Sequence, residues 1–506
     1  MASEDSTFRP AFKLMSGRVA AFVITFMTGP LIARVFSRSE FGTYKQFMLI
    51  TYTLFLIGQC GLAECLFYFL PKKPERGASY ALNSLLMLSI SGVVCWLGLA
   101  VSAGHIAQWM KNEELPHYID IMGAYLLFML MGTVLEISMV SRKRYNLAAV
   151  TYVASDLFRA AFLVIPALVT RSLMWALLGS VVFFFLRVCA IFGYFRSEFS
   201  GRLHLDRSLL KEQWAYALPF SLSVIVQVIQ QNYHQYAVSF HFDPATFAIY
   251  SVGCLQIPLV DFMATPASNV MMVRMTEEQR EGHERNLLPI WHDTTRKLGL
   301  LFFPFVGLLV VNAYGLITVL YTNAYAASVP LFMVWCLSIL LSSFQTDGVL
   351  RVFAQMKYLV GINLVRLAIV LAMMSWFLST FELMGAVLIT LVGMFVAKVL
   401  AVIRIRTVLQ SSFAEILPWR NLAGIFMAAT AAAGPAMVLK TRLSLPALAM
   451  LPLCGMAYVT TYSLLVWTFG LLDEEEKAAL KRSLYIWKRT VGPAQSAPVL
   501  GKAIQQ

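Results

Sequence analysis

The segment Asp156-Leu157-Phe158-Arg159 recurs in this chain as Asn363-Leu364-Val365-Arg366, 207 positions later. Each copy also follows an earlier arginine by the same interval, Arg144 in the first copy and Arg351 in the second. The last arginine of each copy falls inside an apolar run long enough to cross a membrane. An arginine at that depth costs about 3 kcal/mol or more. Its placement at matching points therefore predicts a duplicated fold whose two copies contribute cations to one pathway.

The composition indicates whether the chain folds in water or in a membrane. Of 506 residues, 59% are hydrophobic and only 13% are charged, and the mean hydropathy is +0.69. A soluble domain could not cover so much apolar side chain. Because a helix needs about 20 residues to cross the hydrocarbon, we predict an all-α polytopic membrane protein with about 14 transmembrane helices, over residues 14–33, 46–69, 80–103, 118–140, 147–169, 174–195, 214–239, 247–272, 298–321, 328–348, 358–379, 383–403, 422–439 and 446–469.

The distribution of lysine and arginine over the connecting segments predicts the orientation. If the amino terminus is cytoplasmic, 28 of the 40 lie in cytoplasmic loops and tails and seven in outer loops. Membrane proteins retain such cations on the cytoplasmic side. We therefore expect both termini in the cytoplasm. The net charge of +13 is then a sign of contact with anionic membrane lipid and not with nucleic acid.

A second repeated signal predicts the domain organisation. Phe41-Gly42-Thr43-Tyr44 matches Phe247-Ala248-Ile249-Tyr250 at an offset of 206, nearly the offset of the arginine repeat. Two copies of six spans explain both signals, and an even number of spans gives the copies the same orientation. We predict a first six-helix repeat over 1–195, a cytoplasmic linker over 196–213, a second repeat over 214–404, two additional spans within 405–470 and an amphipathic cytoplasmic tail over 471–506.

The chain offers no sign of an enzyme or of a metal site. Its seven cysteines all lie in apolar segments, without Cys-x-x-Cys spacing or a neighbouring histidine, so we interpret them as core residues. Apart from the carboxyl tail, no hydrophilic stretch is long enough to form a soluble catalytic domain. We expect a protein that is not an enzyme.

The amino-terminal part of the chain resembles a known family. The residues that carry the resemblance are Ala33-Arg34-Val35-Phe36-Ser37-Arg38-Ser39-Glu40-Phe41-Gly42-Thr43-Tyr44, Gly61-Leu62 and Phe67-Tyr68-Phe69-Leu70-Pro71. They are similar to the signature of Wzx-type polysaccharide flippases, which belong to the multidrug/oligosaccharidyl-lipid/polysaccharide exporter superfamily. At the matching place of the second half, this chain departs from the pattern by carrying Gln256.

The resemblance implies a function and a location. Members of this family move lipid-linked oligosaccharides from the inner to the outer leaflet by alternating access, without ATP hydrolysis. The chain would then be a multi-pass protein of the bacterial inner membrane. Its partners would be the lipid-linked oligosaccharide, membrane lipid, and the glycan polymerase and export proteins.

An anionic, diphosphate-linked glycan requires a wet and cationic cavity between the halves, while its polyprenyl tail stays in lipid. Arg159 and Arg366 are the leading ligands, because a planar guanidinium pairs with two phosphate oxygens at once. The alternative for Arg159 is an ion pair with Asp156, three residues earlier. The equivalent neighbour of Arg366 is the neutral Asn363.

Two further arginines inside spans, Arg18 and Arg187, are also candidate substrate ligands. Each has a structural alternative. Arg18 lies about one turn from the predicted cytoplasmic boundary, so it could extend its side chain to the interface. Arg187 could pair with Glu64 or Glu136.

The seventh predicted span carries one polar face. The glutamines and the histidine that form it follow a spacing of three and four residues: Gln227, Gln230, Gln231, His234 and Gln235. Such a face would not contact lipid. We therefore predict that Gln227, Gln231 and His234 bind sugar hydroxyls in the cavity, and the alternative is that this face hydrogen-bonds to neighbouring helices.

Two carboxylates inside spans are candidates for coupling transport to an ion. Asp261 lies in the eighth span near Pro258, and Asp156 precedes the first of the duplicated arginines. The coupling ion would be Na⁺ or H⁺, and we expect no other cofactor. Two alternative functions remain: an ion-coupled drug or cation exporter of the same fold, and a non-transport subunit of a polysaccharide export complex.

Overall fold

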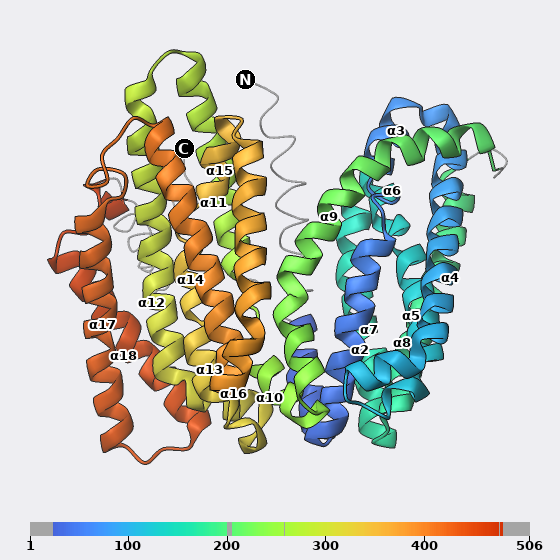
Figure 1. Cartoon of the computed structure of the whole chain (residues 1–506), viewed down its shortest axis with the longest axis horizontal. Coiled ribbons are helices and arrows are strands. Elements are labelled where there is room, and N and C mark those ends of the chain that lie inside the picture. The colour runs from blue at the N-terminus through green and yellow to red at the C-terminus, as the bar shows by residue number, and fades with distance from the viewer. Residues whose placement is uncertain (1–23, 200–204, 258, 475, 479–506) are drawn as a thin grey trace, which may run out of the picture.

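The computed structural model describes residues 24–199, 205–257, 259–474 and 476–478. In this part of the chain the regular elements are helices, which confirms the all-α prediction. A helix over Ile24–Val35 precedes the labelled elements of Figure 1. Those of the first half are α2 (Arg38–Gly58), α3 (Leu66–Lys72), α4 (Gly77–Trp109), α5 (Ile119–Gly132), α6 (Val134–Ser141), α7 (Tyr145–Thr170) and α8 (Leu173–Glu198), and α9 (Arg207–His241) follows as the first helix of the second half.

After α9, the second half continues with a broken helix pair and ends with two long apolar helices. Its elements are α10 (Pro244–Gly253), α11 (Leu259–Arg280), α12 (Leu287–Tyr321), α13 (Ser328–Trp335), α14 (Leu337–Leu341), α15 (Thr346–Val352), α16 (Met356–Val408), α17 (Trp419–Arg442) and α18 (Ala447–Thr468). The 53-residue α16 consists of two arms that meet at Glu382, whose φ of 49° interrupts the helix. A left-handed residue between two apolar runs allows the chain to cross twice.

The number of crossings agrees with the sequence. Nine stretches within the described residues are long and apolar enough to span a membrane, and one of them is the two-armed α16. The remaining crossings are α9, the helix over Ile24–Val35, and the broken pairs α2 with α3 and α10 with α11. The break after α2 places Cys60 and Gly61 in the left-handed region, with φ of 45° and 64°. About fourteen crossings result.

Several boundaries differ from those predicted. The second crossing begins with α2 at Arg38, eight residues before the predicted start at 46. Its start is fixed by a capping box in which the Glu40 amide donates to Ser37 Oγ (3.3 Å) and the Ser37 amide donates to Glu40 Oε2 (2.9 Å). Between the halves, α9 begins at Arg207, inside the predicted linker. The predicted amphipathic tail beyond residue 478 lies outside the described residues.

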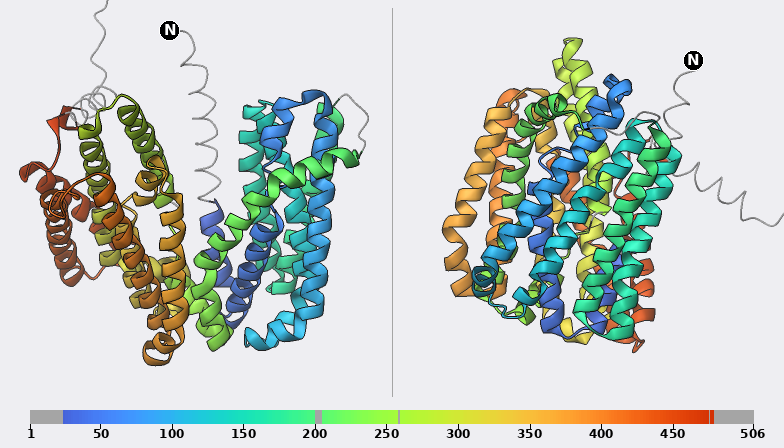
Figure 2. Two further views of the ribbon diagram at one scale, coloured as in Figure 1. Left: turned by 45° about the horizontal axis from the view of Figure 1, so that its top comes forward. Right: turned by 90° about the vertical axis from the view of Figure 1, so that its right-hand side faces the viewer.

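The two halves form separate bundles (Figure 1). The bundle of α2 to α8 lies on the right of the view and α11 to α18 lie on the left, while α9 passes from the right-hand bundle toward the left-hand one. The second view of Figure 2 shows that the helices of both bundles run roughly along one common direction. The bundles approach each other at the end where α10 lies, and they diverge toward the end where α3 and α6 finish. We call the end where α10 lies the sealed end. The end where α3 and α6 finish is called the basic end, because Lys73 and Arg142 lie there.

Close packing of α2 on α10 closes the sealed end. A Cβ added to Gly42 would lie 1.8 Å from the Pro244 carbonyl oxygen, so only glycine permits this approach. Beside it, the Gln46 amide donates to Ser239 Oγ at 2.8 Å across the two halves. Lys111 likewise donates to the His241 carbonyl at 2.7 Å.

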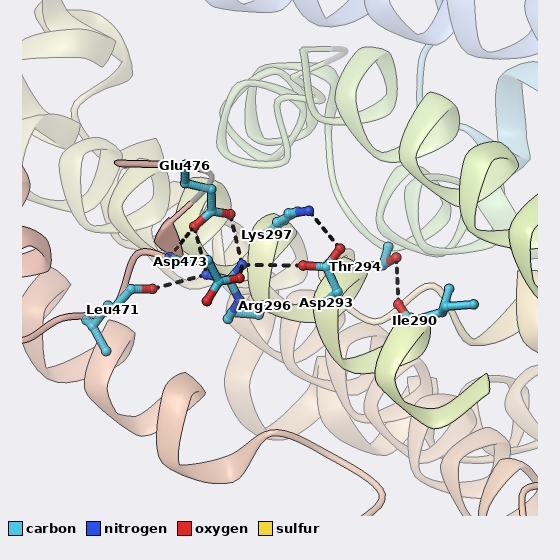
Figure 3. Close-up of polar contacts among 8 residues, drawn as sticks. All are labelled: Ile290, Asp293, Thr294, Arg296, Lys297, Leu471, Asp473 and Glu476. Carbon is cyan, nitrogen blue, oxygen red and sulfur yellow. Dashed lines mark hydrogen bonds and ion pairs between the residues drawn. The ribbon is translucent and has the colours of Figure 1, made fainter. Parts of the chain in front are cut away.

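At the basic end, a buried arginine fastens the segment after α18 to α12 (Figure 3). The side chain of Arg296 is 5% exposed and pairs with Glu476 at 2.8 Å, with Asp293 at 3.3 Å and with Asp473. It also donates to the Leu471 carbonyl at 3.1 Å. Burying a guanidinium is tolerated because its donors are satisfied by acceptors.

Candidate functional site

A cavity lies between the halves in two adjoining compartments, both lined by Leu255 and Gln256. These two residues occupy the non-helical break between α10 and α11. Irregular backbone at membrane depth occurs where it lines a cavity. The break thus places Gln256, where the chain departs from its family pattern, at the junction of both compartments.

The second-half compartment measures about 410 Å³. It brings together four of the residues predicted from the sequence: Gln231, His234, Asp261 and Arg366. They come from α9, α11 and the first arm of α16, so the arrangement depends on the packing of three separate helices. The polar face of α9 therefore contributes two side chains to this compartment.

Arg366 is the central cation of this compartment. Within the described residues no hydrogen bond or ion pair is recorded for its guanidinium, and the same holds for the Asp261 carboxylate. Gly393 on the second arm of α16 faces the stem of Arg366, because an added Cβ would lie 3.5 Å from the Arg366 Cγ. The arginine is thus positioned by packing, and its polar head is available.

The polar residues of α9 divide into two groups. His234 is buried and its Nδ1 lies 2.7 Å from the Tyr250 hydroxyl. Gln230 donates to the Asn363 carbonyl at 2.8 Å, which joins α9 to α16. Gln231 is exposed and lines the compartment. Both alternatives for this face thus occur, helix association and cavity lining, and the Gln227 side chain lies outside the described residues.

The first-half compartment measures about 360 Å³ and holds Arg159. Unlike Arg366, this arginine is engaged: it pairs with Asp156 at 2.6 Å and donates to Thr25 Oγ1 at 2.8 Å. The compartment also contains three tyrosines and three smaller hydroxyl side chains, namely Tyr44, Tyr125, Tyr321, Thr25, Thr28 and Ser180. Hydroxyl groups of this kind can donate to phosphate or to sugar oxygens.

Lys45 lines the same compartment, and the sequence analysis missed it. Span prediction had placed it in the loop before residue 46, whereas α2 already begins at Arg38. The signal that could have found it is the Ser37-x-x-Glu40 capping box, which marks a helix start seven residues before Lys45.

The remaining predicted residues lie elsewhere. Arg187 pairs with Glu136 and donates to the Gly132 carbonyl at 3.2 Å, which is the structural alternative, and it does not line the two compartments. Arg18 lies outside the described residues. Among the residues that are described, no group of three or more His, Cys, Asp or Glu side chains is arranged to hold a metal ion.

Comparison with solved structures identifies the fold. The chain is similar to the lipid II flippase MurJ in an inward closed conformation, with a TM-score of 0.70 and 11% identity over 90% of this chain and 98% of that one. An inward-facing multidrug resistance transporter of the MATE family gives a TM-score of 0.62 at 14% identity, over 77% and 94%. A MOP superfamily transporter from Pyrococcus furiosus gives 0.54 at 14% identity, over 80% and 95%.

Sequence comparison identifies the family. No curated protein matches the chain. The sequence model of the family described as polysaccharide biosynthesis protein matches residues 31–330, which is more than half of the chain. This range includes the Wzx-like signature, the break at Leu255 and Gln256 that lines both compartments, and the first of the duplicated arginines. The chain therefore belongs to the polysaccharide biosynthesis protein family, as its resemblance to Wzx-type flippases predicted.

Proposed function

We propose that this protein moves a polyprenyl-diphosphate-linked oligosaccharide from the cytoplasmic to the outer leaflet of the bacterial inner membrane. The observation that carries the proposal is Arg366, an arginine in a cavity between the two halves that forms no hydrogen bond or ion pair with the described residues. An unpaired guanidinium at membrane depth is stable only if water or an anionic ligand reaches it. A diphosphate supplies such a ligand in a geometry that guanidinium matches.

The polar lining suits the glycan and the apolar surroundings suit the lipid. Amides and hydroxyls such as Gln231, Gln256 and Tyr321 offer hydrogen bonds to sugar hydroxyls. The polyprenyl tail would remain in the bilayer during transport. Such a protein lowers the barrier to crossing without making or breaking a covalent bond.

Alternating access follows from the sealed end. The cytoplasm would correspond to the basic end, where Lys73 and Arg142 lie. The packing of Gly42 on Pro244 then closes the outer side, and reopening it would require the two bundles to rock. Cysteine labelling tests this orientation: Asn323→Cys should react from outside and Ser141→Cys from inside.

Asp261 is the proposed coupling group. It lines the same compartment as Arg366, so its negative charge would oppose the binding of an anionic ligand there. Binding of Na⁺ or H⁺ at Asp261 would remove that opposition and favour the binding of phosphate at Arg366. Asp156 is less available for this role because it pairs with Arg159.

Deletion of the gene tests the function directly. We expect a lipid-linked oligosaccharide to accumulate on the cytoplasmic leaflet and the wild-type gene to reverse this. Unchanged distribution between the leaflets would contradict the proposal. The competing function is export of a cationic drug, for which the carboxylate of Asp261 in the cavity is the favouring observation. Transport of a cationic dye by reconstituted protein, without flipping of the lipid-linked glycan, would support that alternative.

A further inference from the structure

Lys45 is a second cation without a recorded partner in the cavity. It projects from α2 and lines the first-half compartment together with Arg159, Tyr44 and Tyr125. Within the described residues no hydrogen bond or ion pair is recorded for its ammonium group. The contact that is recorded for it is the Phe41 ring, whose centroid lies 5.3 Å from Nζ. An aromatic face stabilises a cation by less than the cation loses when it leaves water.

Of the two duplicated arginines, only Arg366 is free of hydrogen bonds and ion pairs among the described residues. In the first half Arg159 is engaged by Asp156 and Thr25, so in the described part of that half the free cation that lines the cavity is Lys45. The sequence repeat hides this difference, because Lys45 has no counterpart in the repeated segment.

We propose that Lys45 and Arg366 hold the phosphate groups of the substrate from opposite halves, while Arg159 positions α7 through its pair with Asp156. This inference rests on the proposed function and assigns a ligand residue to it. Among the described residues, each half then supplies one free positive charge to the cavity, so a diphosphate bound at the junction near Gln256 would draw the bundles together.

Lys45 lies closer to the sealed end than Arg159 does, and this position suggests its part in phosphate binding. It lies seven residues from the start of α2, or about 10 Å from the sealed end at 1.5 Å per residue. Arg159 lies 11 residues from the end of α7, about 16 Å from the same end. Lys45 is therefore the cation nearer to the seal. A lysine donates in three directions from a flexible stem, which suits a phosphate that must leave when the seal opens.

Binding of inorganic pyrophosphate to the purified full-length protein tests the inference, with isothermal titration calorimetry as the readout. We expect Lys45→Met to weaken binding about tenfold, the loss of one hydrogen-bonded charge. Lys45→Arg should stay within about threefold of wild type because it keeps the charge. The matched control is Lys357→Met, since Lys357 is exposed at the start of α16 and lines neither compartment.

When the variants are present in the membrane at equal levels, flipping of the lipid-linked oligosaccharide should rank them in the same order as pyrophosphate binding: Lys45→Arg near wild type and Lys45→Met lower. If Lys45→Met does not accumulate, Lys45→Gln keeps a polar chain of similar length and replaces it in both assays. Wild-type affinity in Lys45→Met or Lys45→Gln, together with weakened affinity in Arg366→Gln, would overturn the role of Lys45 alone. Failure of the wild-type protein to bind pyrophosphate, with normal flipping in Arg366→Gln, would instead overturn the proposed function.

Discussion

The two halves place an arginine at equivalent points of α7 and α16, yet the two side chains have different surroundings. Arg159 forms a 2.6 Å ion pair with Asp156, whereas Arg366 follows the neutral Asn363 and pairs with none of the described residues. One difference, Asp against Asn three residues earlier, determines whether the guanidinium is available to a ligand. Duplication has thus preserved the position of the charge while the neighbouring residue has changed its use.

The pairing of Arg159 is strengthened by its partial burial. The side chains of Arg159 and Asp156 are 32% and 27% exposed, so neither is fully hydrated and each stabilises the charge of the other. Arg366 forms no such ion pair with the described residues, and the charge of Asp347 acts on it only from a distance. It should therefore gain more from an anionic ligand than Arg159 does.

Neutralising Arg366 should have the largest effect on transport. We expect Arg366→Gln to reduce flipping about ten- to a hundredfold, because each hydrogen bond to a charged group contributes about 1.5–3 kcal/mol. Arg366→Lys should retain part of the activity, since it keeps the charge but loses the two-pronged geometry. The measurement is the rate of flipping by reconstituted protein. Arg351→Gln, which changes an exposed arginine at the end of α15, is the control and should be silent.

Making the second half resemble the first should have the next largest effect. Asn363→Asp introduces a carboxylate three residues before Arg366, as in the first half, and should occupy the guanidinium. We expect flipping to fall about tenfold, consistent with one competing charged contact. Asn363→Gln is the matched control, and the backbone carbonyl that Gln230 contacts is kept in both variants. Equal activity of the two variants would show that pairing at this spacing does not limit Arg366.

Breaking the ion pair of the first half should affect stability more than transport. Arg159→Gln leaves Asp156 as an unpaired, half-buried carboxylate, which should lower the free energy of unfolding by about 1–2 kcal/mol, less than for a fully buried pair. The double variant Asp156→Asn/Arg159→Gln should recover most of this loss. Thermal unfolding in detergent measures the effect. If the double variant remains inactive in flipping after its stability has recovered, Arg159 contacts the substrate itself.

The sequence predicted the architecture and several of the residues that line the cavity. Apolar length predicted about fourteen crossings, because a membrane imposes a fixed span on every helix. Helical spacing correctly grouped Gln231 with His234, and the interval of three residues indicated the pair of Asp156 with Arg159. In each case the residues lie within one helix, so a single segment of the sequence is enough to predict that they are close together.

The missed features depend on packing or on helix boundaries. Hydropathy placed Lys45 in a loop, since charged residues near a span end lower its average, although the capping box at Ser37 and Glu40 begins the helix earlier. The choice of Glu136 over Glu64 as the partner of Arg187 depends on how α6 packs against α8. Asp261 and Arg366 line one compartment because α11 and α16 lie close together. No single segment of the sequence reveals this packing.

The two halves also differ in the ion pairs that hold their helices together at the basic end. Variants of these ion pairs should have the smallest effect on transport. In the first half, Lys73 donates to Glu212 at 2.9 Å, and Tyr80 donates to the same carboxylate at 2.8 Å. In the second half, the corresponding fastening is the buried Arg296 cluster. Exposed pairs contribute little to stability, whereas removing one partner of a buried cluster leaves unpaired charges. Arg296→Gln should therefore lower the midpoint of thermal unfolding clearly, and Glu212→Gln only slightly.

The effect of pH distinguishes the two fastenings further. Hydrogen bonds from Lys73 and then Tyr80 lower the pKa of Glu212 below its ordinary value of 4.5. The unfolded chain therefore binds this proton more readily than the folded protein. The stabilisation is present above the unfolded pKa and is lost as pH falls through the lowered folded value. We expect the small difference in unfolding midpoint between wild type and Glu212→Gln at pH 7 to shrink toward pH 4. A difference that grows on acidification would show that Glu212 is protonated in the folded protein and that this contact does not fasten α9 to α4.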